Sequence, residues 1–182
     1  MYIMEQKCIF KSSIWRVFEV FVNDPLKLHY IKEISRKIKL APTSVKKHLE
    51  DLQKQEIIIK KKGERFFGYV ANRDNEDFLF YKKTFNFINL RESGLIDFIK
   101  DSLYPKTIIL YGSYLRGEDV GGSDVDLFVL TEKKKKLDFE KFEKILKRPI
   151  HAIIENGLKK LNKNLRLELS NGLILYGFLK NG

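Results

Sequence analysis

A glycine–serine pair in the middle of the chain has the residue types and the position of a phosphate-binding turn. Gly112-Ser113 follows the apolar, β-branched run Thr107–Leu110, so it falls where a strand ends and a helix is expected to begin. Glycine lets a ligand approach the backbone, and the N–H groups at a helix start carry partial positive charge. The spacing therefore predicts that backbone amides of Gly112 and Ser113 face an anion.

Two carboxylates follow closely, at Asp124 and Asp126. The apolar residues of Val125–Leu130 predict a buried strand, and side chains two residues apart on a strand project from the same face. Neighbouring carboxylates repel unless a cation lies between them, and oxygen ligands suit Mg²⁺ or Mn²⁺ with substrate phosphates as further ligands. Taken singly, the two features would be an ordinary strand-to-helix turn and a solvated strand edge. Together they predict nucleotide chemistry.

The run from Gly112 to Leu127 resembles the signature of the DNA polymerase β-like nucleotidyltransferase superfamily, and most of all its small, minimal members. That signature is Gly-Ser, a short helix, Arg-Gly, a loop and Ser-Asp-x-Asp on a strand. The resemblance implies metal-dependent transfer of a nucleoside monophosphate from a triphosphate, expected to be ATP, to an acceptor hydroxyl. It implies catalytic metal ligands at Asp124 and Asp126, and nucleotide-binding residues at Gly112, Ser113, Arg116 and Ser123. Small members modify proteins, RNAs or small molecules, so a protein acceptor is among those implied.

The superfamily usually places a third carboxylate on a neighbouring strand. The strand expected at Pro149–Ile154 has His151 at that position, and Glu155 lies four residues, or about 13 Å, further along. A neutral histidine can ligate a metal or accept a proton, but it brings no negative charge. Two hypotheses therefore stay open. Either His151 completes a catalytic set, or the domain belongs to a DNA-binding regulator and binds metal and nucleotide without turnover.

The N-terminal segment has the pattern of a helix-turn-helix. Amphipathic helices are predicted at Ile14–Val22, Tyr30–Ile38 and Pro42–Gln53, and a tight turn joins the last two. The second helix of such a pair enters the DNA major groove. With Val45, Leu49 and Leu52 facing inward, the third helix has an outward set that is small, polar and basic: Thr43, Ser44, Lys46, Lys47 and His48.

A β-hairpin is predicted next, with strands at Ile57–Lys60 and Phe66–Val70 around a basic turn. With it the segment resembles the winged helices of bacterial and archaeal regulators, which implies double-stranded DNA as partner. Lys61, Lys62 and Arg65 are the phosphate contacts expected on the wing. A solvated basic face and a protein-docking winged helix are the alternatives. A homodimer is a further expectation, by analogy with dimers on palindromic sites.

The elements that position these residues divide into an α+β chain of two domains. The polar stretch Asn72–Glu76 predicts a boundary, giving a winged helix-turn-helix domain at 1–74, a linking helix at 75–90, and a small nucleotidyltransferase α/β domain with a mixed sheet at 91–182. The aromatic residues of the linking helix are expected to pack into the core, although they could also seat a dimer partner. Further helices are predicted at Leu95–Leu103 and Asp138–Lys147.

Charge and composition limit the classes of function. The 182 residues carry a net charge of +11, and the first 75 hold 16 Lys/Arg against 9 Asp/Glu, which indicates a polyanionic partner for that segment. The run Lys133–Lys136 either guides an anionic substrate or is a hydrated loop. The sequence has no apolar run near the eighteen residues of a membrane span and no signal-peptide pattern. With a single cysteine, Cys8, we expect a cytoplasmic protein without membrane association.

Overall fold

The computed structural model describes residues 12–158 and 161–179, so Cys8 lies outside the described residues. The described chain divides into two compact units, one ending at Phe78 and the other beginning at Leu79. This division falls inside a helix, a few residues beyond the boundary predicted at 74/75.

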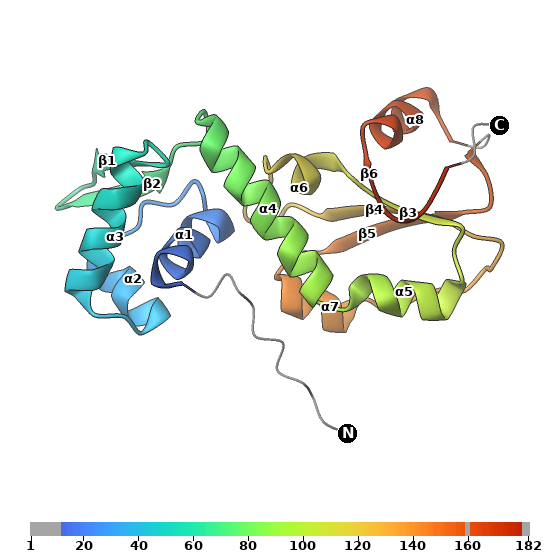
Figure 1. Cartoon of the computed structure of the whole chain (residues 1–182), viewed down its shortest axis with the longest axis horizontal. Helices are drawn as coiled ribbons and strands as arrows, with labels where there is room; N and C mark the ends of the chain where they lie inside the picture. Colours follow the sequence, from blue (N-terminus) through green and yellow to red (C-terminus); the bar gives the residue numbers. More distant parts are fainter. Residues whose placement is uncertain (1–11, 159–160, 180–182) are drawn as a thin grey trace, which may run out of the picture. The chain divides into compact units, whose positions relative to one another are not determined.

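Three helices and a β-hairpin form the N-terminal unit (Figure 1). The elements are α1 (Ser13–Asn23), α2 (Ile31–Ile38), α3 (Pro42–Lys54), β1 (Ile58–Lys62) and β2 (Phe67–Ala71). Helix α1 begins where the Ser12 hydroxyl accepts a hydrogen bond from the Trp15 amide, and α3 begins at Pro42, whose missing N–H is harmless in a first turn. The order of elements is that of a winged helix, and that assignment stays a prediction.

The apolar periodicity of the three helices is confirmed by their burial. Val45, Leu49 and Leu52 of α3 are buried as predicted, and they meet α1, α2 and the hairpin in one core. The hairpin differs from the predicted one in one detail. Lys62 pairs with Phe67, and the Gly63 amide donates to the Phe66 carbonyl at 2.9 Å, so Lys61 and Lys62 belong to strand β1 rather than to the turn. Continued ladder pairing therefore shortens the predicted turn.

His29 makes the stability of this unit depend on pH. It is only 1% exposed, its ring packs edge-on against Phe21, and Nε2 lies 3.0 Å from the Asp24 carbonyl oxygen, which fits a neutral ring with Nε2–H donating. Burial lowers the pKa of His29 below its ordinary 6.5. Below that pH the unfolded chain takes up a proton that the folded unit does not. The free energy of unfolding should then fall on acidification, by up to about 1.4 kcal/mol per pH unit.

Urea unfolding between about pH 7 and about pH 5, followed by fluorescence of Trp15, the chain's only tryptophan, measures this dependence. The His29→Gln variant keeps an amide donor for the Asp24 carbonyl but does not titrate, so the slope should flatten. Thr43→Gln, which replaces an exposed residue of α3 that does not titrate, is the control and should keep the slope of the unmodified chain. An equal slope in both variants would show that His29 is not the responsible group.

The C-terminal unit is built on a mixed four-stranded sheet, as predicted (Figure 1). Strand β3 pairs antiparallel with β4 and β6, whereas β4 and β5 are parallel, giving the order β5-β4-β3-β6. Helix α4 (Glu76–Glu92) starts in the first unit and continues into the second. The remaining elements are α5 (Leu95–Leu103), β3 (Thr107–Tyr111), α6 (Gly112–Arg116), β4 (Val125–Leu130), α7 (Glu140–Leu146), β5 (Ile150–Glu155), α8 (Lys163–Ser170) and β6 (Leu173–Gly177).

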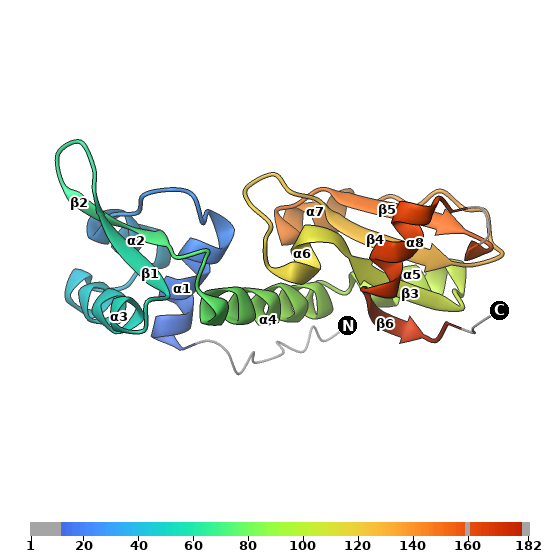
Figure 2. The ribbon, with the colours of Figure 1, turned by 90° about the horizontal axis from the view of Figure 1, so that it is seen from above.

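Helices cover both faces of this sheet (Figure 2). Ile108 and Leu110 of β3 pack with α5 and α7 on one face, and Ile109, Tyr111 and Phe128 pack with residues of α8 on the other. The alternation follows from the two-residue period of a strand. Because α8 lies on the same face as Tyr111 and Phe128, any even-numbered side chain of β4 points toward the α8 side.

The aromatic residues of α4 only partly meet the prediction that they are core. Phe78 and Phe85 are buried, but Phe80 is 62% exposed and Phe87 is 45% exposed. A single helix has one inward stripe, and these two residues lie outside it. None of the helices that the structure describes is both long enough and apolar enough to cross a membrane.

Candidate active site

Asp126 and His151 lie side by side on neighbouring strands. The parallel register of β4 and β5 pairs them directly, and His151 Nδ1 is 3.2 Å from Asp126 Oδ1. The Asp126 side chain is 23% exposed and that of His151 is 58% exposed. Burial raises the pKa of Asp126 above its ordinary value, the hydrogen bond from His151 opposes this, and the charges of Asp124 and Glu168 raise the pKa further. His151 therefore lies beside Asp126 on the neighbouring strand, and its role in a site stays a prediction.

Gly112 keeps the backbone close to the Asp126 carboxylate. Its φ is +77°, a conformation that other residues rarely adopt, and a Cβ built there would collide with Asp126 Oδ2. Tyr111, just before it, pairs with Asp126 across β3 and β4. The predicted strand–turn–helix is thus observed, with α6 starting at Gly112 itself. Because Gly112 has no side chain, the Asp126 carboxylate can lie directly against the backbone of the turn.

The other predicted residues lie around this point. Ser113 is half-buried in α6, and Asp124 is exposed, one residue before β4 begins. The Ser123 hydroxyl accepts a hydrogen bond from the Val120 amide at 3.0 Å, so its oxygen is used within the loop. Arg116 is held by two carboxylates, with Nε 2.8 Å from Glu118 Oε2 and Nη1 3.1 Å from Glu168 Oε2. A phosphate bound by Arg116 would compete with these ion pairs.

One comparison with known families bears on this fold and site. Residues 92–172 match the nucleotidyltransferase domain family. The match covers α5 through α8, including the Gly112 turn, both aspartates and His151. A comparison with curated proteins gave no match. A nucleotidyltransferase domain is therefore present in the second unit.

The residues of the nucleotidyltransferase domain fit a hard divalent cation that takes part of its ligands from a substrate. Asp124 and Asp126 supply oxygen donors, and the absence of a side chain at Gly112 lets the second of them keep its place against the turn. Within residues 12–158 and 161–179, no three His, Cys, Asp or Glu side chains are grouped to hold a metal ion. Mg²⁺ commonly binds through one or two carboxylates together with substrate phosphates, so the pair is sufficient for that mode of binding.

Glu168 is a site residue that the sequence reasoning missed. It lies on α8, bonds to Arg116, and is close enough to Asp126 to raise its pKa. A signal for α8 was present in the sequence, because Asn162 caps the helix through the Leu165 amide and Leu165 and Leu169 are four residues apart on the side facing the sheet. Glu155 and the Lys133–Lys136 run are at the other end of the strands, since Glu155 pairs with Leu130. The lysine run therefore does not line this site.

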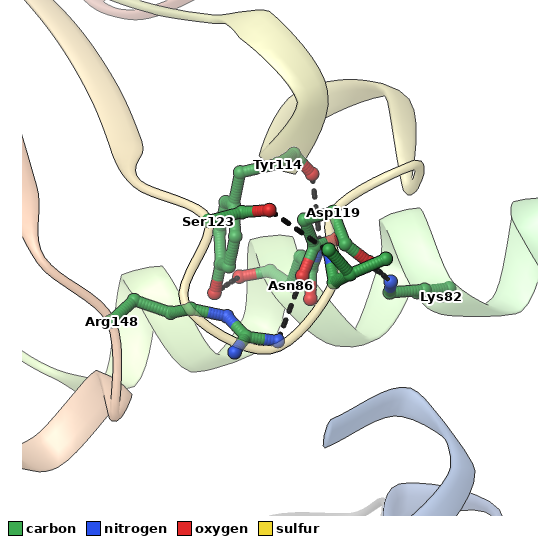
Figure 3. Close-up of polar contacts among 7 residues, drawn as sticks. Lys82, Asn86, Tyr114, Asp119, Ser123 and Arg148 are labelled. Atoms are coloured by element: carbon green, nitrogen blue, oxygen red, sulfur yellow. Dashed lines mark hydrogen bonds and ion pairs between the residues drawn. The ribbon is translucent and has the colours of Figure 1, made fainter. Parts of the chain in front are cut away.

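A buried polar cluster around Asp119 was also missed (Figure 3). Asp119 is 1% exposed, and its carboxylate accepts bonds from Asn86, at 2.9 Å, and from Arg148, at 3.1 Å, and forms an ion pair with Lys82 at 3.0 Å. Its signal was the polar pair Lys82 and Asn86 on the same helical stripe as the buried Phe78. Two polar side chains at core positions of a helix require a buried partner.

The predicted DNA-contacting residues of the N-terminal unit lie mainly on its surface. Lys61, Lys62 and Arg65 of the hairpin are exposed, and on α3 so are Thr43, Lys46 and Lys47, whereas Ser44 is half-buried. Lys46 is 3.8 Å from Glu50. His48 differs from the prediction that it faces outward. It is half-buried, and its Nε2 is 2.8 Å from the Ser13 hydroxyl of α1, which ties α3 to α1.

Proposed function

We propose that the protein is a Mg²⁺-dependent nucleotidyltransferase that moves a nucleoside monophosphate from a triphosphate, expected to be ATP, to an acceptor hydroxyl. The observation that carries this proposal is the pairing of Asp126 with His151 beside the Gly112 turn, inside a nucleotidyltransferase domain. In the reaction the acceptor oxygen bonds to the α-phosphorus, the bond to the β-phosphate oxygen breaks, and pyrophosphate leaves.

We assign the roles from the positions of the side chains. Asp124 and Asp126 would hold the metal, and the amides of Gly112 and Ser113, with Arg116 and Ser123, would bind the triphosphate. A divalent cation bound there supplies charge stabilisation at the transferring phosphate. Arg116 would exchange Glu118 and Glu168 for phosphate oxygens, which present the same paired acceptor geometry to a guanidinium.

We assign His151 the role of general base, which takes the proton of the acceptor hydroxyl. A neutral ring with Nδ1–H donating to Asp126 leaves Nε2 as an acceptor, and the side chain is exposed enough to meet an acceptor hydroxyl. Asp126 would then fix both the tautomer and the orientation of the ring. This is how a histidine would serve where the superfamily usually has a third carboxylate.

The test is release of pyrophosphate from each labelled nucleoside triphosphate with Mg²⁺ or Mn²⁺ by the full chain. Release that depends on metal supports the proposal, and absence of pyrophosphate with every triphosphate and acceptor rejects it. The alternative function is a regulator that senses a nucleotide, and it is favoured by one observation, a histidine instead of a carboxylate at the third position. Nucleotide binding without pyrophosphate release, together with a change in DNA binding, would select that alternative.

The exposed basic residues of the hairpin support a further part of the proposal, binding of double-stranded DNA by the N-terminal unit as a winged helix. Replacing Lys61, Lys62 and Arg65 together by alanine should weaken binding and lower the slope of log affinity against log salt, by about 0.9 for each phosphate that the hairpin no longer neutralises. Fluorescence anisotropy with a labelled duplex, measured over a series of salt concentrations, gives both quantities.

The matched control replaces three exposed lysines of the other unit, Lys134, Lys135 and Lys136, by alanine. It changes the net charge by the same amount and should leave the salt slope unchanged. Equal losses of affinity in the two triple variants would mean that the duplex responds to net charge alone, and the hairpin would have no specific role. Replacing Lys46 and Lys47 tests α3 in the same way.

A further inference from the structure

The loop that joins α6 to β4, residues 117–124, carries Ser123 and Asp124 into the candidate site. Gly121 and Gly122 at its tip are exposed and have no side chains, and glycine has the greatest conformational freedom of any residue. Two hydrogen bonds close the tip: the Ser123 amide donates to the Val120 carbonyl, and the Val120 amide donates to the Ser123 hydroxyl, both at 3.0 Å. Both bonds lie within the turn, so they do not attach it to the rest of the domain.

Asp119 is the residue that anchors this loop to the domain (Figure 3). Lys82 Nζ pairs with its carboxylate at 3.0 Å and also donates to its backbone carbonyl. Asn86 donates from one amide nitrogen to Asp119 and to the Tyr114 carbonyl of α6, each at 2.9 Å, and the Tyr114 hydroxyl donates back to the Asn86 carbonyl at 3.1 Å. The loop is therefore tied to α4 and, through Asn86, to α6.

Arg148 completes the anchor from a third direction. It lies between α7 and β5, is 8% exposed, and its Nη2 is 3.1 Å from Asp119 Oδ2. Arg148 comes three residues before His151, which lies on β5 and pairs with Asp126 of β4. Both oxygens of one buried carboxylate are thus occupied by groups from separate elements, which leaves it a single orientation.

A purely stabilising role explains this cluster poorly. Buried ion pairs contribute little net stability compared with apolar residues of similar volume, because both charges lose their hydration, and their clearest use is to select one arrangement. The arrangement selected here is that of the loop that ends at Asp124, five residues after Asp119. The anchored residue, Asp119, and the first carboxylate of the candidate site, Asp124, thus lie in the same loop.

We propose that Asp119, held by Lys82, Asn86 and Arg148, positions the 117–124 loop so that Asp124 stands beside Asp126, and that this sets the affinity of the site for a metal–triphosphate complex. The inference rests on the proposed nucleotidyltransferase function. Asp119 and its partners are positioning residues, since they act through Ser123 and Asp124. Loss of such outer interactions typically weakens metal binding 10- to 100-fold.

The test is the Lys82→Met variant of the full chain, which removes one anchor while Arg148 still neutralises Asp119. Calorimetric titration with Mn²⁺ and a non-cleavable ATP analogue should show a dissociation constant raised about tenfold or more, with an unchanged number of sites per chain. Lys100→Met is the matched control, because it breaks an exposed Lys–Asp pair of the same 3.0 Å length, with Asp97, and should bind as the unmodified chain does. Lys82→Arg should recover part of the affinity.

A merely structural role gives a different result, namely fewer sites per chain with an unchanged dissociation constant, and that result overturns the proposal. If Lys82→Met does not fold, Asn86→Ser replaces it, since this change uncovers no buried charge, and a dissociation constant unchanged from the unmodified chain would again overturn the proposal. Absence of binding in the unmodified chain would reject the proposed function and this inference together. Binding that is normal in both chains rejects only the inference.

Discussion

The Asp126→Asn variant is expected to lose nucleotidyl transfer by about 10³-fold or more while unfolding at the same or a higher temperature than the unmodified chain. A carboxylate that holds the metal contributes several kcal/mol to the transition state, and each 1.36 kcal/mol is a factor of ten in rate. Asparagine is nearly isosteric and its Oδ1 can still accept from His151 Nδ1. It therefore removes the charge and keeps the shape.

The stability half of this prediction follows from the direction of the pKa shift. Folding raises the pKa of Asp126, chiefly by burial, so the ionised group destabilises the folded state at neutral pH. The neutral amide is free of that destabilisation. Functional residues are often retained at such a disadvantage to stability. An inactive variant with a lowered melting temperature would instead indicate that Asp126 supports the fold.

Pyrophosphate release and thermal unfolding, measured on the same preparation, give the two halves of the result. Asp101→Asn is the control, since it removes one exposed carboxylate from α5 and should change neither quantity. His151→Gln separates the roles within the pair. It should lower the rate and leave the affinity for metal and nucleotide nearly unchanged, because the two aspartates remain. Full activity in the Asp126→Asn variant would contradict the assigned site.

The second large effect is expected at Asp119, where alanine should lower the free energy of unfolding of the C-terminal unit by about 3–5 kcal/mol. Removing one partner of a buried pair leaves an uncompensated charge in a medium of low polarity. Here two cations would lose the carboxylate that they share, since Lys82 is 0% exposed and Arg148 is 8% exposed, and Asn86 would lose an acceptor. A loss of this size is a large part of the 5–15 kcal/mol that holds a typical domain together.

Hydrogen exchange of the β3 and β4 amides in the full chain, followed by mass spectrometry, measures this loss in the unit concerned. The control is Asp97→Ala, which breaks the exposed pair with Lys100 and should change the free energy by less than about 1 kcal/mol. Asp119→Asn should fall between the two, since the amide oxygen still accepts one bond. A loss at Asp119 as small as that at Asp97 would show that water reaches Lys82 and Arg148.

Some parts of the fold could be predicted because their signals are local. The strand at Thr107, the turn at Gly112 and the strand from Val125 were each visible as an apolar run next to a glycine or a charged pair, and all three are observed. The position of His151 followed from the resemblance to the superfamily, which usually has a third carboxylate on that strand, and the register of β4 and β5 pairs His151 with Asp126. Helix α8 has a capping residue and a helical spacing of leucines in the sequence. It was not predicted because it is only eight residues long.

Other parts depend on contacts between residues far apart in the chain. In the sequence His48 follows two lysines that are predicted to face outward with it. Its ring nevertheless bonds to Ser13, 35 residues away. Phe80 and Phe87 have the composition of a core helix, yet they lie off the single stripe that the core covers. No local pattern determines which of several polar or apolar residues on a helix meets a partner.

The sequence by itself determined the chemistry of the site, because the turn glycine and the two aspartates at Asp124 and Asp126 are close in the chain and their geometry follows from a turn and a strand. The tertiary structure alone decided what holds that chemistry in place. Lys82 and Arg148 are separated from Asp119 by 37 and 29 residues, and a buried charge is stable only where the fold brings its counter-charge to within bonding distance. That distance is a property of the packed domain.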